Sequence, residues 1–196
     1  MYVPKTTGQV LYYRALIDPK IPIVVVSGPA GSGKTLFAST IGSKSVSDGR
    51  YEKLVITRPT VSVDEKHGFL PGNLEDKMQP WTRPVTEKLS KKTSVEICPL
   101  GFMRGRTFDS SWIIADEMQN STPNQMKMVM TRVGERSKLV ITGDPRQYDR
   151  GFDENGFEDL IHRIKKRASD YIQYIELSED DVLRSEVVKE VLRMYT

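Results

Sequence analysis

One stretch of the sequence has the residue types and spacing of a phosphate-binding loop. Residues 28–35 read G-P-A-G-S-G-K-T and match the pattern G-x-x-x-x-G-K-[ST] at every fixed position. Glycines allow a tight bend whose backbone N–H groups point at phosphate oxygens, while Lys34 can reach the β- and γ-phosphates. The sequence therefore predicts a nucleotide site formed by the loop and the start of the following helix: Gly28, Pro29, Ala30, Gly31, Ser32, Gly33, Lys34, Thr35 and Leu36.

An acidic pair is the second group that could do chemistry. Asp116 and Glu117 directly follow the apolar residues 111–115, a pattern typical of a buried strand. We expect Asp116 to bind Mg²⁺ together with the Thr35 hydroxyl, because an acid at the end of such a strand holds this ion in phosphate-loop enzymes. Glu117 would orient or deprotonate the attacking water. The acidic doublet favours hydrolysis over binding alone.

The apolar pattern also predicts the elements that position these groups. Short runs rich in β-branched residues predict strands over residues 23–26, 53–59, 95–100, 111–115 and 171–177, and another from 138 that ends in a polar turn at Gln147. Gln147 lies where a γ-phosphate sensor is expected. Helices are predicted over residues 6–16, after the phosphate loop, from an N-cap at Thr122, over 156–168 and over 182–195. This alternation indicates an open α/β sheet.

Gln9 could recognise the base of a nucleotide. A glutamine amide can pair with the N6/N7 edge of adenine in two hydrogen bonds, and Tyr12 or Tyr13 could stack on the base. The alternative is a surface glutamine and two core tyrosines.

A second group of residues could contact nucleic acid. Arg58 ends the second predicted strand, where ligands gather in open α/β sheets, and Phe69 lies in the long irregular loop that follows. Arg104 and Arg106 surround a glycine and have Phe102 beside them, so they could hold phosphates and stack a base. Two solvated arginines in a turn are the alternative.

Composition limits the class of protein. The 196 residues predict one domain over 1–196, and 38% hydrophobic with 28% charged residues predicts a globular core. A net charge of +3 permits nucleic-acid binding without arguing for it. Because the sequence has one cysteine and no signal peptide or membrane-length apolar run, we expect a soluble, cytoplasmic protein without membrane contact. Structural zinc is a poor fit, with only Cys98, His67 and His162 available.

Taken together, these residues resemble the PhoH family of ATPases, which are related to the first RecA-like domain of superfamily 1 helicases. The most specific match is the string I-A-D-E-M-Q-N-S-T-P at residues 114–123. The resemblance implies a P-loop NTPase with a single RecA-like parallel sheet and helices on both faces. It also implies ATP and Mg²⁺ binding, ATP hydrolysis, adenine contact by Gln9, a γ-phosphate sensor at Gln147 and a candidate arginine finger at Arg184.

The sequence also departs from this family. Arg146 and Tyr148 stand where a small or aliphatic residue is more usual, and there is no length for the PIN ribonuclease domain that some members carry. A compact form that begins almost at the ATPase core is similar to those encoded by viruses and phages.

One set of motifs in one domain predicts that the completing arginine, Arg184 or Arg132, comes from a neighbouring subunit. We therefore expect a homo-oligomer, with a hexameric ring favoured. The leading hypothesis is a helicase-like ATPase that acts on single-stranded nucleic acid, with RNA favoured over DNA. The alternatives are a small-molecule kinase and an ATP-gated module that recruits a nuclease or RNA-maturation partner. A metal nuclease fits poorly, because the best acidic pair is already assigned to Mg²⁺ and ATP.

Overall fold

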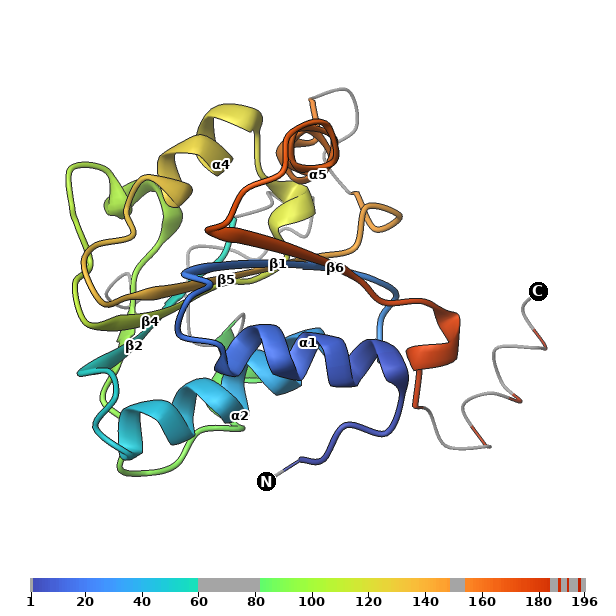
Figure 1. The fold of residues 1–196 in the computed structure, drawn as a ribbon, viewed down its shortest axis with the longest axis horizontal. Helices are drawn as coiled ribbons and strands as arrows, with labels where there is room; N and C mark the ends of the chain where they lie inside the picture. The colour runs from blue at the N-terminus through green and yellow to red at the C-terminus, as the bar shows by residue number, and fades with distance from the viewer. Residues whose placement is uncertain are drawn as a thin grey trace, which may run out of the picture.

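Six strands form one parallel sheet in the order β3-β2-β4-β5-β1-β6 (Figure 1). The computed structural model describes residues 2–59, 82–148 and 154–183, with Val187, Glu190 and Met194. Of the predicted site residues, Phe69 and Arg184 lie outside this part of the chain. The strands are β1 (Ile23–Ser27), β2 (Lys53–Thr57), β3 (Val95–Ile97), β4 (Ser111–Ala115), β5 (Lys138–Gly143) and β6 (Ile172–Glu176).

Helices cover both faces of this sheet, as predicted. In Figure 1, α1 (Thr7–Ile17) and α2 (Lys34–Ser47) lie on one face, and α4 (Pro123–Met130) and α5 (Gly156–Lys166) lie on the other. Residues 82–86 are also helical, and three short 3-10 helices follow strands or turns: η1 (Leu100–Met103), η2 (Met118–Asn120) and η3 (Glu179–Asp181). Within the described residues, no helix has the length and apolar character needed to cross a membrane.

Several element boundaries differ from the sequence prediction by one to three residues, and β2 ends at Thr57 instead of residue 59. The third strand ends at Ile97 instead of residue 100, because Pro99 has no N–H to donate to a ladder and the chain turns directly into η1. Helix α5 ends at Lys166, two residues before the predicted end. The predicted start of α4 is confirmed: Thr122 is the N-cap, Pro123 follows, and the Gln125 side chain completes a capping box.

Lys138 is a buried cation that holds one end of α1. It begins β5 with only 1% of its surface exposed. Its Nζ donates to the carbonyls of Ala15, Leu16 and Asp18, at 3.0, 2.9 and 2.7 Å. These carbonyls belong to the last turn of α1 and to its C-cap residue, Asp18, where helices leave backbone acceptors unpaired. Burial lowers the pKa of Lys138 to about 8, so the ammonium with its three donors persists at neutral pH.

We expect Lys138→Met to lower the free energy of unfolding by about 2–4 kcal/mol at pH 7, because the buried carbonyls of Ala15 and Leu16 lose their donor. Denaturant unfolding followed by circular dichroism measures this loss. Lys166→Met, at an exposed position in α5, is the control and should change stability little.

The difference in unfolding free energy between the wild type and Lys138→Met should also depend on pH. Between pH 8 and about 10.4 the unfolded lysine still binds a proton that the folded one has released. The stability of the wild type relative to the Lys138→Met variant should therefore rise with pH across this window. A difference that stays flat from pH 8 to 10 would contradict the assignment.

Candidate active site

The phosphate loop connects β1 to α2 at the carboxyl edge of the sheet. Gly28, Gly31 and Gly33 have φ values of 152°, 86° and 97°, which other residues rarely adopt. Helix α2 begins at Lys34, so its N-terminal N–H groups face the loop. This backbone shape is a concave set of donors suited to phosphate oxygens.

The Lys34 side chain folds back and contacts the backbone of this loop. Its side chain is buried, with 9% exposed, and Nζ donates to the carbonyls of Gly28 at 2.6 Å and Pro29 at 2.9 Å. Burial lowers the pKa of Lys34, while the nearby carboxylates of Asp144, Glu117 and Asp116 act in the opposite direction. The ammonium is therefore placed within the loop, between the backbone and the acidic residues.

Asp116 lies at the end of β4 and joins two other elements. Its Oδ1 accepts from the Thr35 hydroxyl of α2 at 2.8 Å and from the Thr142 hydroxyl of β5 at 2.5 Å. Asp116 is 3% exposed. Two hydroxyls and a carboxylate are hard oxygen donors of the kind that Mg²⁺ prefers, so these residues fit the predicted metal. Thr142 was not a sequence candidate, because only the pairing of β4 with β5 brings it beside Asp116.

Glu117 has an unusual backbone and a fixed side chain. Its φ of 55° and ψ of 39° lie in the left-handed region, which is uncommon for residues other than glycine. Its Oε2 accepts from the Gln119 amide at 2.7 Å. The other end of that amide accepts from the Asp144 backbone N–H at 3.1 Å. Gln119 thus holds the carboxylate of Glu117 against the turn that follows β5.

Gln147 is joined to the same turn. Its amide Nε2 donates to Asp144 Oδ2 at 2.9 Å. Hydrogen bonds therefore run from Glu117 through Gln119 and Asp144 to the predicted sensor residue. Gln119 and Asp144 are members of this site that the sequence reasoning missed, although Gln119 lies within the string at residues 114–123 that matched the family.

Gln9 is buried beneath the phosphate loop, with 2% of its surface exposed. Its Nε2 donates to the carbonyls of Ser32 at 3.2 Å and Asp181 at 3.1 Å, and its Oε1 accepts from the Lys5 N–H at 3.0 Å. Adenine contact by Gln9 stays a prediction and would require these bonds to exchange. Of the two alternatives for Tyr12, the structure supports the core tyrosine, because Tyr12 is fully buried and its hydroxyl donates to the Lys34 carbonyl.

The proposed nucleic-acid residues divide into two groups. Arg58 follows β2, and Phe102 and Arg104 follow β3, at the same carboxyl edge as the phosphate loop. Phe102 is 63% exposed. Arg106 instead pairs with Glu96 at 2.5 Å, and its guanidinium lies over the Phe108 ring. A phosphate contact by Arg106 would compete with this ion pair.

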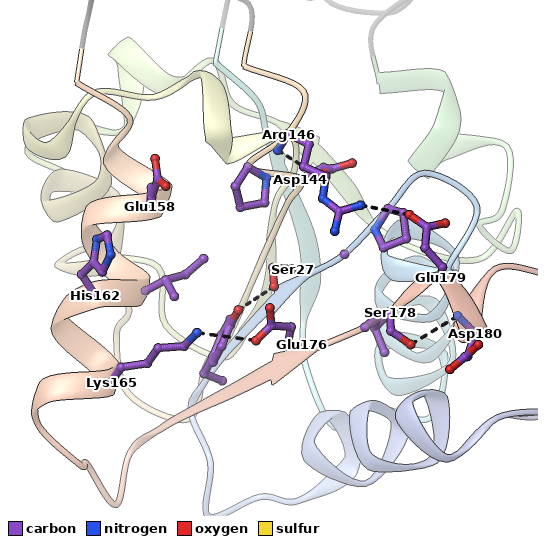
Figure 2. A pocket seen from close by; sticks show the side chains of 16 residues that line it. Ser27, Asp144, Arg146, Glu158, His162, Lys165, Glu176, Ser178, Glu179 and Asp180 are labelled. Carbon is purple, nitrogen blue, oxygen red and sulfur yellow. Dashed lines mark hydrogen bonds and ion pairs between the residues drawn. The ribbon is translucent and has the colours of Figure 1, made fainter. Parts of the chain in front are cut away.

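A pocket of about 590 Å³ borders the start of the phosphate loop on the side of α5 (Figure 2). Tyr174 lines it and shares a hydrogen bond of 2.6 Å with Ser27, the residue before the loop. Figure 2 shows Arg146 and Glu179 pointing toward one another, joined by an ion pair of 3.0 Å. The phosphate loop is thus flanked by residues that come from β6 and the segment after it.

Comparison of the sequence with known proteins identifies the family of this chain. The family model for PhoH-like proteins matches residues 1–196. The chain belongs to the PhoH-like family. It is 38% identical to a PhoH-like protein of Bacillus subtilis, covering 97% of this chain and 63% of the relative. It is 32% identical to Protein PhoH of Escherichia coli, covering 95% of this chain and 56% of the relative. The chain thus spans less than two thirds of these relatives.

A solved structure supports the fold of this PhoH-like chain. The Pif1 helicase from Candida albicans matches 99% of the chain with a TM-score of 0.50, at 16% identity and over 43% of the helicase. With the parallel sheet and the phosphate loop, this confirms a P-loop NTPase fold of the RecA-like helicase type.

We expect Thr142→Val to weaken Mg²⁺-dependent nucleotide binding about tenfold, because groups that orient a metal ligand affect metal affinity by this much. The measurement is a Mg²⁺ titration with a fluorescent nucleotide. Thr142→Ser keeps the hydroxyl that contacts Asp116 and is the matched control. Equal Mg²⁺ affinity in the Val and Ser variants would show that the Thr142 hydroxyl does not contribute to the metal site.

Proposed function

We propose that this PhoH-like protein hydrolyses ATP and couples hydrolysis to binding or remodelling of single-stranded nucleic acid, with RNA favoured. The observation that carries the proposal is the convergence of Thr35 and Thr142 on Asp116, beside Lys34 in a glycine-rich loop. The family membership and the helicase-type fold support it.

Each residue of the site has a distinct role in this proposal. The loop N–H groups and Lys34 bind the phosphates of ATP, and Thr35 and Asp116 hold Mg²⁺, which neutralises phosphate charge when bound. Glu117 positions the attacking water and accepts its proton, with Gln119 fixing the direction of the carboxylate. Gln147 reports on the γ-phosphate through Asp144.

Nucleic acid is proposed to bind at the carboxyl edge of the sheet. Arg58 and Arg104 supply cations there, and the exposed ring of Phe102 offers a stacking surface. Arg58 follows β2, the neighbour of β4, whereas Phe102 and Arg104 follow β3, one strand farther out. A nucleic-acid strand that runs along this edge from β3 to β2 would come near Asp116. Such proximity could couple nucleic-acid binding to turnover.

We expect purified protein to hydrolyse ATP, and single-stranded RNA to increase the rate several-fold. Lys34→Ala should reduce turnover by more than about 100-fold, since it removes the charge that meets the phosphates. Phosphate release measured with and without RNA or DNA checks both statements. Glu117→Gln should bind nucleotide but turn over slowly, which separates binding from hydrolysis.

Three outcomes would redirect the proposal. Absence of hydrolysis in the wild type would refute it. Hydrolysis indifferent to nucleic acid would favour the ATP-gated recruitment module. Phosphate found on an added metabolite would favour the kinase.

The arginine that completes the site is proposed to come from a neighbour in a ring-like homo-oligomer, a hexamer being favoured. The Arg132 guanidinium already makes hydrogen bonds within its own chain. Its Nε donates to the Met128 carbonyl at 3.2 Å and its Nη1 to the Arg106 carbonyl at 3.0 Å. Arg184, outside the described residues, is therefore the preferred candidate.

We expect Arg184→Ala to reduce turnover by about 10³-fold or more while sparing ATP binding, as loss of an arginine finger does. Mixing this variant with Lys34→Ala should restore part of the activity, because a subunit with an intact phosphate loop can then receive an arginine from its neighbour. Sedimentation before and after mixing verifies subunit exchange. No recovery in exchanged oligomers would place the arginine within its own chain.

A further inference from the structure

A segment far along the chain, residues 177–181, contacts the beginning of the phosphate loop. The Leu177 N–H donates to the Ser27 carbonyl at 2.8 Å, which continues the pairing of β1 with β6 by one residue. A Cβ added to Gly28 would lie 2.7 Å from Leu177 Cβ. The first residue of the loop is therefore fixed against Leu177 by sterics and by the backbone.

The same segment reaches the later half of the loop through Gln9. The Asp181 carbonyl and the Ser32 carbonyl accept hydrogen bonds from one amide nitrogen, Gln9 Nε2, at 3.1 and 3.2 Å. Gln9, Ser32 and Asp181 are 2%, 0% and 5% exposed, so water does not readily replace these bonds. Asp181 therefore shares a buried polar contact with a loop that lies about 150 residues earlier in the chain.

The Asp181 carboxylate is itself held at the start of α1. Its Oδ1 accepts from the hydroxyl of Thr6, the N-cap residue of α1, and its Oδ2 accepts from the Ser178 N–H at 2.8 Å. A Cβ on Gly8 would come within 2.5 Å of this carboxylate, so glycine makes the approach possible. A negative charge at a helix N-terminus is also favourable.

The other contact of this segment with the site is weaker. Glu179 pairs with Arg146, but both side chains are exposed, 68% and 78% (Figure 2). Exposed pairs of this kind contribute about 0–1 kcal/mol. The buried Asp181 contacts, in contrast, fix the segment to α1 and to the loop.

We propose that Asp181 is a positioning residue of the nucleotide site. Its carboxylate holds the start of α1, and with it Gln9, whose amide donates to the Asp181 backbone carbonyl. Gln9 in turn fixes the Ser32 carbonyl and the later half of the phosphate loop. The inference rests on the proposed nucleotide binding. Losing Asp181 leaves Lys34, Asp116 and Glu117 intact, so it weakens nucleotide binding more than it slows turnover at saturating ATP.

Asp181→Ala tests this with two readouts. Hydrogen exchange of residues 28–35 in the nucleotide-free protein should become faster, and the Kd for a fluorescent ADP should rise about tenfold, with kcat within about twofold of the wild type. Asp180→Ala is the matched control, because it removes the same charge from the same 3-10 turn at an exposed position. It should change neither readout.

Gly8→Ala perturbs the same contact without removing the carboxylate. Alanine favours a helix by about 1 kcal/mol over glycine, so this variant should fold even if Asp181→Ala does not. Its methyl group would displace the carboxylate, and we expect the same faster exchange and weaker ADP binding. In the double variant the clash is absent, so Gly8→Ala should add no further loss to Asp181→Ala.

The outcomes separate this inference from the proposed function. Additive effects of the two substitutions, or wild-type exchange and ADP affinity in both single variants, would overturn the role of Asp181. A wild-type protein that binds no nucleotide would overturn the proposed function, while loop exchange in the nucleotide-free variants would still test the positioning contact.

Discussion

The site depends on the parallel register of three neighbouring strands, β4, β5 and β1. Val26 lies opposite Thr142, and Ala115 lies opposite Ile141, so the residues that follow all three strands meet at one edge. A slip of one residue would turn Thr142 to the opposite face of the sheet and remove its hydroxyl from Asp116. The apolar side chains buried on both faces prevent such a slip, and in this way the core fixes the geometry of the polar site.

Helix α1 is as much a part of this site as α2, although it precedes every motif. Gln9 contacts the Ser32 carbonyl, and one turn later the Tyr12 hydroxyl contacts the Lys34 carbonyl at 3.0 Å. The Tyr12 ring packs edge-on against Phe37 of α2, and burial raises its pKa well above the usual value. With Lys138 at its other end, α1 is held along its length, so its stability and the shape of the phosphate loop are physically linked.

The sequence predicted the features whose causes are local. The glycine pattern of the loop, the acid after an apolar strand and the Thr122 cap each depend on residues close together in the chain. Thr142 and Asp181 were missed because their partners are distant and the contacts arise only from strand pairing and from the docking of η3. The same limit explains why the sequence left both alternatives open for Tyr12, since nothing local distinguishes a tyrosine that stacks on a ligand from one that packs in the core.

In this structure two side chains of the phosphate loop donate hydrogen bonds to carbonyls of the loop itself. Lys34 donates to the carbonyls of Gly28 and Pro29, and the Ser32 hydroxyl donates to Pro29 as well. For Lys34 and Ser32, a nucleotide entering the loop must therefore exchange hydrogen bonds instead of adding them, and an exchange of this kind yields only a modest net gain for each bond. Affinity then depends on how much of the loop backbone already has the shape that phosphate requires. That shape is maintained by buried contacts with α1 and the segment after β6, and for this reason residues without a phosphate contact of their own can control nucleotide binding.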